Sequence, residues 1–390
     1  ENPDFTCAKL FWWYNMYSSA DWTITPRPMY PADGRKIFDV YTQPMEMREE
    51  IKADLGEFPF PTFWGPMAGI ASSEWIAESA KWTEKKHQPT LSLVYLPHLD
   101  YGLQKFGPGA EEMDAEIAKI DTVVGELIDF YESRDVEVVL LSEYGISKVD
   151  KPIHLNRLFR EKGWIAIKEE LGTEMLDCGA SRVFAVADHQ VAHVYVNDAS
   201  IRDEVQQLLL DTDGVEEVRL AEESFGGTSD ECGVRSEECQ QDAGNLKSQI
   251  TYYKSSALAR SGDLIAVSEK NAWFTYYYWM DDAVAPDFAR CIDIHRKPGY
   301  DPVELFIDPE LKVPKLKIAK FLLKKKLGLR GLLDVIPLDA SLVKGSHGRD
   351  TVEVDEQPIY ATRGSHVPVN AAEDVFARIE QLVSGVEERF

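Results

Sequence analysis

The sequence lacks the features that mark membrane and secreted proteins. No run approaches the roughly 18 apolar residues of a membrane helix, and no charged stretch followed by an apolar one marks a signal peptide. Cysteine is scarce: the five residues are odd in number and scattered, which argues against a disulfide framework. Only Cys232 and Cys239 lie close in sequence, and whether they pair stays open. We therefore expect a soluble protein, with a cytoplasmic location favoured and the oligomeric state undetermined.

Basic residues are also few, with 42 Lys and Arg against 67 Asp and Glu, which gives a net charge of −25. Such a field repels nucleic acid and anionic lipid, so we expect neither as a partner. One segment departs from this pattern. Residues 315–333 alternate Lys with Leu, Ile and Phe at amphipathic helical spacing. Binding to a membrane surface would suit this composition, but a solvated helix face on an acidic protein is the favoured interpretation.

What the sequence does contain is an alternation of strand and helix patterns. A continuous apolar run at 90–96, apolar positions at helical spacing over 110–131 and a second apolar run at 136–141 follow one another. Runs of this kind suit strands that are covered on both faces. A strand, a helix and a strand of this length predict a βαβ unit with parallel strands. The fold class is therefore predicted to be α/β.

The pattern divides the chain into three parts. We predict an α/β core over 1–152, an α+β insert or cap over 153–270 and a return to the core over 271–390. The insert includes a polar loop at 221–260. Further elements are predicted as helices at 72–82, 153–163, 200–211, 315–333 and 371–387, and as strands at 183–186, 191–196 and 273–279.

Two acids follow the two apolar strands of the βαβ unit. Asp100 comes shortly after the first strand, beside His98, and Glu143 comes after the second, beside Tyr144. Parallel strands end at the same edge of a sheet, where α/β proteins bind ligands. Gly145 would let the backbone turn away so that Glu143 points into the crevice. The alternative is structural, with Asp100 as a helix cap and His98 as a hydrogen-bonded histidine.

Two later motifs bring histidine to positions that suit ligand contact. In Gly345-Ser346-His347-Gly348, a histidine lies between glycines, where the backbone can approach another group closely. His189 and His193 are four residues apart, too far apart on a strand to share one ion. For His189 we therefore favour contact with substrate or a structural role over metal binding.

A fifth group lies near residue 295. Asp293 and His295 are two positions apart, so on a strand their side chains would lie on the same face and could contact a ligand together. Arg296 and Lys297 follow and could clamp an anion. A salt-bridged turn is the equally favoured alternative.

The order of these motifs resembles the alkaline phosphatase superfamily and, within it, the type I phosphodiesterase/nucleotide pyrophosphatase family. The resemblance rests on Pro97-x-x-Asp100, Gly107-Pro108, the long helix, Ser142-Glu143-Tyr144-Gly145 and Gly345-x-His347-Gly348. It runs from about residue 5 to 365, with 221–260 as an insertion. It implies a three-layer fold, with a mostly parallel sheet, helices on both faces and two metal ions at the carboxyl edge.

The resemblance also implies a set of site residues. Asp100, Glu143, Tyr144 and His347 would be the metal ligands. Gln104 would support them at a ligand position of the family. From the residues themselves we add His98, His189, Asp293 and His295 as contacts to substrate or support for the ligands. Three ligand positions depart from the family pattern, because Gln104 and Tyr144 replace histidines and Glu143 replaces aspartate, and Arg349 replaces a tyrosine beside His347. The family usually holds Zn²⁺, whereas this oxygen-rich set suits Mn²⁺ or Mg²⁺.

The family's nucleophile, a Thr or Ser, belongs before residue 5, so we expect it upstream of Glu1 and assign none here. The resemblance implies a metal-dependent hydrolase of phosphodiester, phosphoric ester or pyrophosphate bonds, with a small phosphate ester or a nucleotide as substrate. The alternative is a non-catalytic ligand-binding relative that has kept the fold and lost the full site.

Overall fold

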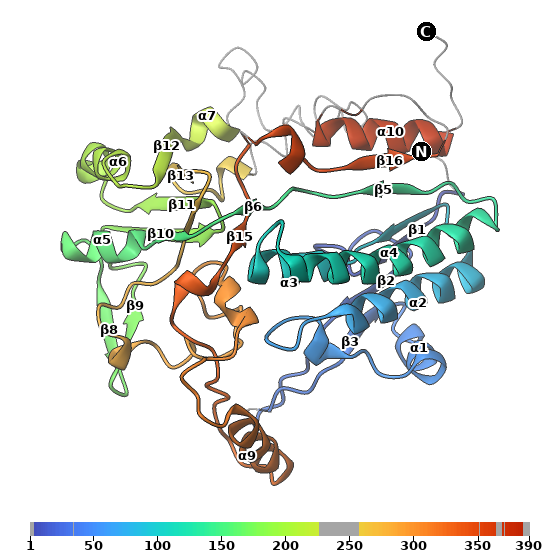
Figure 1. The fold of residues 1–390 in the computed structure, drawn as a ribbon, viewed down its shortest axis with the longest axis horizontal. Coiled ribbons are helices and arrows are strands. Elements are labelled where there is room, and N and C mark those ends of the chain that lie inside the picture. The colour runs from blue at the N-terminus through green and yellow to red at the C-terminus, as the bar shows by residue number, and fades with distance from the viewer. Residues whose placement is uncertain are drawn as a thin grey trace, which may run out of the picture. The chain divides into compact units, whose positions relative to one another are not determined.

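The computed structural model describes residues 4–33, 35–225, 257–350, 352–363, 369 and 371–384 (Figure 1). The chain forms two compact units. The first unit comprises Glu1–Ile146, Glu304–Leu333 and Glu353–Phe390, and the second comprises Ser147–Val303 and Asp334–Val352.

The first unit contains a sheet with mixed strand directions. Strand β1 (Cys7–Leu10) pairs in parallel with β2 (Trp22–Pro26) on one side and with β4 (Leu91–Val94) on the other. Strand β3 (Val40–Gln43) completes the order β3-β2-β1-β4 and runs antiparallel to β2. The α/β class and the strand predicted at 90–96 are confirmed.

Four helices of the first unit come from its N-terminal part: α1 (Met47–Leu55), α2 (Ile70–His87), α3 (His98–Phe106) and α4 (Glu111–Glu132). Helices α2 and α4 lie side by side (Figure 1). Met113, Ile120 and Leu127 of α4 are buried at intervals of seven residues, which places them on one face. Acidic residues fill the first turn of α4, where the helix dipole favours them. The helix predicted over 110–131 is confirmed.

Strand β5 (Val139–Leu141) is paired differently from the prediction. It pairs antiparallel with β16 (Tyr360–Thr362), in the register Tyr360 to Leu141, whereas β4 bonds to β1. The expectation that the strands at 90–96 and 136–141 are parallel neighbours is therefore wrong among the strands that the structure describes. The segment that pairs with β5 comes from far along the chain, and hydrophobic periodicity carries no information about such a partner.

The second unit is built on an antiparallel sheet in the order β10-β11-β13-β12. Its strands are β10 (Val183–Asp188), β11 (Val191–Val196), β13 (Leu264–Ser268) and β12 (Val215–Leu220). Val183, Ala185 and Ala187 alternate into the core at the period of a strand. Buried residues of α5 (Leu155–Glu161) and α6 (Arg202–Leu210) belong to the same core. The predicted strands at 183–186 and 191–196 and the helix at 200–211 are confirmed.

Short elements make up the rest of the second unit. Strand β7 (Lys151–Ile153) pairs in parallel with β14 (Ala272–Phe274), β6 (Ser147–Lys148) pairs with β15 (Gly345–Ser346), and β8 (Ile167–Glu170) pairs with β9 (Thr173–Leu176). Short 3₁₀ turns lie at Phe60–Thr62, Ala199–Ile201, Asp282–Val284, Pro302–Leu305, Ala340–Leu342 and Val354–Glu356.

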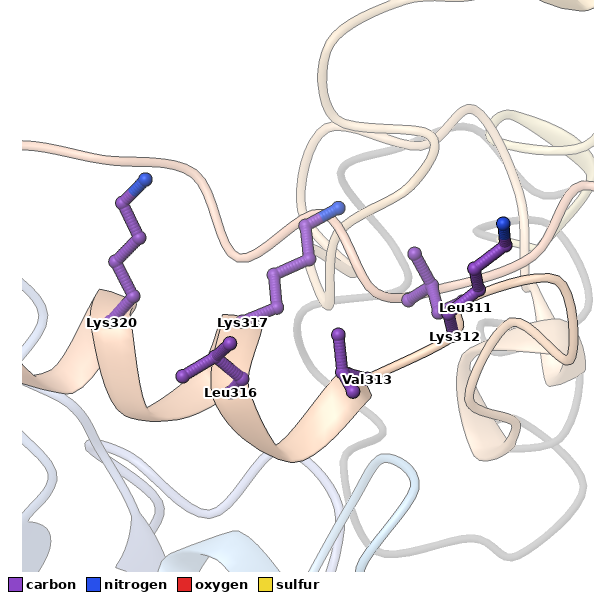
Figure 2. A pocket seen from close by; sticks show the side chains of 6 residues that line it. All are labelled: Leu311, Lys312, Val313, Leu316, Lys317 and Lys320. Atoms are coloured by element: carbon purple, nitrogen blue, oxygen red, sulfur yellow. The ribbon is translucent and has the colours of Figure 1, made fainter.

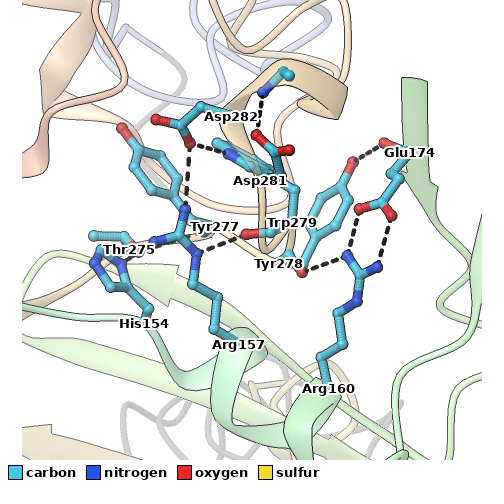
Figure 3. A network of polar contacts seen from close by, with 11 residues as sticks. His154, Arg157, Arg160, Glu174, Thr275, Tyr277, Tyr278, Trp279, Asp281 and Asp282 are labelled. Carbon is cyan, nitrogen blue, oxygen red and sulfur yellow. Dashed lines mark hydrogen bonds and ion pairs between the residues drawn. The ribbon is translucent and has the colours of Figure 1, made fainter. Parts of the chain in front are cut away.

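The aromatic segment predicted as a strand over 273–279 keeps strand geometry only as far as Phe274. Beyond it the side chains are buried, and helix α5 supplies partners for the backbone (Figure 3). Arg157 Nε donates to the Trp279 carbonyl at 2.7 Å, and Arg160 donates to the Tyr278 carbonyl at 3.1 Å. Because buried carbonyls need hydrogen-bond donors, these arginines replace the missing strand partner. The helix predicted at 153–163 begins at Leu155, after β7.

The remaining predictions fall partly on described residues. Ala221–Phe225 forms helix α7, so the first five residues of the polar loop predicted at 221–260 are helical instead. Residues 226–256, with Cys232 and Cys239, lie outside the described part of the chain. Helix α9 (Pro314–Lys326) is shorter than predicted, and α10 (Ala372–Ser384) matches the predicted terminal helix. Among the helices that the structure describes, none has both the length and the apolarity to cross a bilayer.

Candidate functional site

Asp100 lies in the first turn of helix α3. The helix follows β4 after a short connection and begins at His98, and a carboxylate is favoured at the positive end of a helix dipole. Pro97 occupies the N-cap position, and no side chain caps the helix. The structural alternative for Asp100, a capping aspartate, is therefore wrong.

Two phenols hold the Asp100 carboxylate. The Tyr144 hydroxyl donates to Asp100 Oδ2 at 2.9 Å, which brings together the two segments that the sequence placed after successive strands. Tyr95, the first residue beyond β4, also hydrogen-bonds to Asp100. We missed Tyr95 because it continues an apolar run. Tyr95 could have been identified from its position, because it lies at the end of a strand that is followed by the polar residues His98 and Asp100.

The electrostatics of this group favour an added positive charge. Burial, with a smaller contribution from the negative charge of Glu143, raises the pKa of Asp100 to about 6, against the lowering effect of the phenol hydrogen bonds. Partial removal from water also raises the pKa of Glu143, although its side chain still reaches solvent. No described Lys, Arg or His forms an ion pair with either acid. A cation bound between two such carboxylates would reduce the repulsion between their negative charges.

This electrostatic arrangement predicts a pH dependence of stability. Folded Asp100 loses its proton near pH 6, whereas the reference value for the carboxyl is 3.8. Between these values the folded state binds more protons, so the free energy of unfolding falls as pH rises, by up to roughly 3 kcal/mol from this group. Asp100→Asn, measured by urea denaturation in chelator from pH 4 to 8, should lose this fall and be more stable than wild type above pH 7.

The matched control for that measurement is Asp121→Asn, an exposed acid on α4. It should keep the wild-type pH profile. An Asp100→Asn profile parallel to wild type would contradict the assignment of the raised pKa to Asp100.

Gly145 lies at a close approach of two backbone segments. A Cβ at this position would be 1.6 Å from the carbonyl oxygen of Glu356. Glycine is therefore required here by the neighbouring segment 353–356, which the sequence could not reveal. The segment that carries Glu143 and Tyr144 is positioned by this contact.

Gly145→Ala is expected to destabilise the protein by about 1–3 kcal/mol, because the added methyl group forces the two backbones apart. Thermal denaturation measures the effect. Gly125→Ala is the control, since a Cβ at that position in α4 meets nothing within 4 Å and alanine is the better helix former. Equal melting temperatures for Gly145→Ala and wild type would show that the close contact is absent.

Two other predicted residues share helix α3 with Asp100. His98 is buried, and its Nε2 lies 2.8 Å from Glu116 Oε2 of helix α4, with its ring edge-on to Tyr101. Burial lowers the pKa of His98. A residue two positions away on a helix faces a different side, so His98 joins α3 to α4 while Asp100 meets the tyrosines. Gln104 is buried one turn beyond Asp100.

A separate group of rings lies within the second unit. The ring centroids of His189 and His347 are 3.8 Å apart, and the Tyr300 ring stacks on His189 at 4.1 Å. His189 occupies the tight turn between β10 and β11 with φ +59, and Ser346 Oγ lies 3.4 Å from its Nδ1. Burial lowers the pKa of His347 to about 4 and lowers that of His189 well below its usual range. Both imidazoles are therefore neutral at pH 7, the form that binds cations.

The group near residue 295 is not on a strand. Arg296 N donates to the Asp293 carbonyl, which closes a turn, and the Arg296 guanidinium lies 3.3 Å from Asp293. His295 is exposed. Lys297 instead forms a buried ion pair with Asp301 at 2.7 Å. The shared strand face is therefore wrong, and the salt-bridged turn is the observed arrangement. Anion binding by Arg296 and Lys297, and contact of Asp293 and His295 with substrate, stay predictions.

The structure therefore brings together Asp100, Glu143, Tyr144 and Tyr95 in the first unit, and His189 with His347 in the second. Among the described residues, no three or more His, Cys, Asp or Glu side chains converge in a way that could hold a metal ion. Two carboxylates are fewer than the four-ligand set of a structural zinc site. They match the one or two carboxylates with which Mg²⁺ is commonly held, the rest of its ligands being water and substrate oxygens.

Comparison with known proteins gives a consistent set of relatives. A family model described as type I phosphodiesterase / nucleotide pyrophosphatase matches residues 1–301. An uncharacterized pyrophosphatase/phosphodiesterase of Schizosaccharomyces pombe is 35% identical over 77 residues, which is 19% of this chain and 15% of that protein. Solved structures were matched as well, and two of them serve as examples.

Murine ectonucleotide pyrophosphatase / phosphodiesterase 5 matches with 14% identity and a TM-score of 0.41, over 80% of this chain and 58% of that one. Phosphonoacetate hydrolase from Sinorhizobium meliloti 1021 matches with 18% identity and a TM-score of 0.36, over 57% and 46%. The chain thus spans less than two thirds of each of these relatives.

Proposed function

Because the chain belongs to the type I phosphodiesterase / nucleotide pyrophosphatase family, we propose that it is a metal-dependent hydrolase of phosphodiester, phosphoric ester or pyrophosphate bonds. The observation that carries the proposal is the group formed by Asp100, Glu143, Tyr144 and Tyr95, in which two acids with raised pKa values lie together without a cationic partner among the described residues. Two acids that repel one another and are partly removed from water destabilise the folded state, so such a pair commonly marks a functional site.

The proposed cofactor is Mg²⁺ or Mn²⁺ rather than Zn²⁺. Asp100 and Glu143 would be its protein ligands in the first unit, and both supply the hard oxygen donors that these ions prefer. A bound divalent ion polarises phosphoryl oxygens and neutralises charge as the phosphorus–oxygen bond breaks. His347, expected from the sequence as a metal ligand, and His189, expected as a substrate contact, are both neutral at pH 7 and stay proposals within the second unit.

The role of the surrounding residues follows from their hydrogen bonds. Tyr144 donates to Oδ2 of Asp100 and so fixes the rotamer of the carboxylate. The tyrosine donors also favour the ionised form of Asp100, which opposes the effect of burial. Together they hold an acid that is largely ionised above pH 6 and ready to accept a cation. The three-layer arrangement of the sheet and its helices is likewise our proposal for the core.

The proposed substrates are small phosphodiesters or nucleotides with a pyrophosphate bond, as the family description implies. Hydrolysis of a p-nitrophenyl phosphodiester, a p-nitrophenyl monoester and a p-nitrophenyl sulfate ester, each with Mg²⁺, Mn²⁺ or Zn²⁺, tests the proposal. We expect the diester to be cleaved fastest and Mn²⁺ or Mg²⁺ to support the rate.

Faster cleavage of the sulfate ester would contradict the proposal and indicate a different chemistry on this fold. Binding of a nucleotide without hydrolysis of any ester would favour the second candidate, a ligand-binding relative with an incomplete site. One observation favours this second candidate: among the described residues, fewer than three His, Cys, Asp or Glu side chains converge at any one place in a way that could hold a metal ion.

A further inference from the structure

A strongly basic segment lies within this acidic chain. Residues 311–333 contain eight Lys and Arg and no Asp or Glu. The rest of the sequence holds 34 basic residues (42 less these eight) against 67 acids, which is a net charge of −33. Helix α9 occupies the middle of this segment, which we call the basic segment.

Helix α9 has no buried residue. The exposed fractions of Leu316, Leu323 and Leu327 are 65%, 59% and 66%. A surface helix is normally held to its protein by the burial of its apolar side chains, and these three leucines do not contribute to that burial free energy. The favoured interpretation of the sequence is a solvated helix face on an acidic protein, with membrane-surface binding as the alternative. The structure shows that leucines and lysines are exposed together.

Three of the exposed leucines form one stripe, whereas Leu322, which is 54% exposed, lies on another side of the helix. Leu316, Leu323 and Leu327 are seven and four residues apart, so they lie within about 40° of one another around the helix axis. The same geometry places Lys320 and Lys324 on one flank of the stripe. Lys315 and Lys326 fall on the other flank. Apolar side chains between two rows of cations are the pattern of a helix that lies in a membrane interface.

The opposite face of α9 is the one that meets the protein. Lys325 Nζ donates to the Lys36 carbonyl at 2.9 Å and lies 5.1 Å from the centre of the Phe38 ring. Arg330 Nε, beyond the helix, donates to the Asp33 carbonyl at 3.0 Å. Phe321 and Ile318 on this face are only partly exposed. The helix is therefore fixed to the first unit while its leucine stripe points away from these contacts.

The N-terminal end of α9 is hollowed. A hollow of about 270 Å³ is lined by Leu311, Lys312, Val313, Leu316, Lys317 and Lys320. Figure 2 shows the three lysine side chains extending toward the same side, with Leu316 and Val313 beside them. Ammonium groups above an apolar floor suit a phosphate headgroup whose acyl chains continue over the leucines.

We propose that the basic segment binds the surface of an anionic lipid bilayer. The lysines supply charge complementarity and the leucine stripe supplies apolar area, and neither suffices alone for stable binding. The remaining negative charge of the chain would be repelled by such a surface, which limits contact to this helix and fixes its orientation. This proposal replaces the expectation, drawn from net charge, that the protein has no membrane partner. An acidic protein would pair with the lysines but leave the three leucines in water.

Flotation of the full chain with phosphatidylcholine vesicles, and with vesicles of phosphatidylcholine and phosphatidylserine, tests the proposal. We expect binding to the anionic vesicles only. We expect a loss of at least about tenfold in affinity with either Lys320→Glu/Lys324→Glu or Leu316→Ser/Leu323→Ser/Leu327→Ser, since both interactions contribute. Because α9 has no buried residue, these variants should fold, and circular dichroism checks this.

Two control variants carry matched changes elsewhere: Lys148→Glu/Lys162→Glu, and Leu171→Ser at a fully exposed hairpin turn. Both should bind anionic vesicles as wild type does. The proposal is overturned by equal binding to neutral vesicles, by no binding to either, or by controls that lose binding equally. Binding to soluble polyglutamate that is as tight as binding to anionic vesicles, and unaffected by the leucine changes, would also overturn it and point to an acidic protein partner.

Discussion

Asp100→Asn/Glu143→Gln is expected to lower kcat/KM for a phosphodiester substrate by at least about a hundredfold. The reason is the loss of both carboxylates that we propose as ligands of the divalent ion, because even residues that only support metal ligands cost about 10–100-fold when changed. The amide side chains keep the size of the originals, so the fold should survive. Steady-state kinetics with saturating Mn²⁺ measure the effect.

The control for this double variant is Asp203→Asn/Glu204→Gln, which makes the same change of charge at two exposed acids of α6. It should keep the wild-type rate within about twofold. A rate in the Asp100/Glu143 variant that equals the rate of this control would mean that neither carboxylate takes part in catalysis.

The second large effect concerns stability. Asp301→Asn is expected to lower the free energy of unfolding by about 3–5 kcal/mol, because it removes the negative charge from a buried ion pair. The two side chains are 1% and 3% exposed, and their charged atoms are 2.7 Å apart. Asp301 also accepts a hydrogen bond from Val303 N, which holds the end of the turn. Chemical denaturation at pH 7 measures the change.

A double variant, Lys297→Met/Asp301→Leu, should recover much of that loss, because it removes both charges rather than one. The exposed pair formed by Lys86 and Glu50 gives the comparison, and Glu50→Gln should cost less than about 1 kcal/mol. If Asp301→Asn cost no more than Glu50→Gln, the ion pair would have to be exposed to water in solution.

Hydrophobic periodicity predicted most of the elements correctly. The helix over 110–131 was visible because Met113, Ile120 and Leu127 bury one face, and β10 and β11 were visible through their alternation. Strand partners were not predictable, since β5 pairs with a segment more than 200 residues away. The aromatic run after Phe274 was predicted as a strand because its residues are β-forming and buried. In the structure, the backbone carbonyls of this run accept hydrogen bonds from arginines of helix α5 instead of from a neighbouring strand.

The candidate site was predictable in part. The sequence singled out Asp100 and Tyr144, and the structure joins them through a hydrogen bond. Tyr95 was missed because a tyrosine in an apolar run carries no sign of a polar role until its neighbours are known. The motif at 293–297 left a strand and a salt-bridged turn open, and only the fold shows that Asp293 and Arg296 close a turn. For α9, leucines and lysines were both visible in the sequence, but only the structure shows that both kinds of side chain face water.

The resemblance to the family, drawn from the order of short motifs, is confirmed by the family match over residues 1–301. Each motif alone was compatible with a cap, a turn or a solvated histidine. Their order along the chain was more informative, because it reflects a shared succession of strands and helices. The roles of individual residues do not follow from that order, and they remain proposals that mutation must test.

The measurement that tests the central claim most directly is the titration of Mn²⁺ into the chelator-treated protein at pH 8, followed by calorimetry. The account predicts near-stoichiometric binding that Asp100→Asn/Glu143→Gln abolishes and that weakens toward pH 5 as Asp100 takes up its proton. Absence of binding to the wild type, or undiminished binding to the double variant, would contradict the assignment of Asp100 and Glu143 as the cation site.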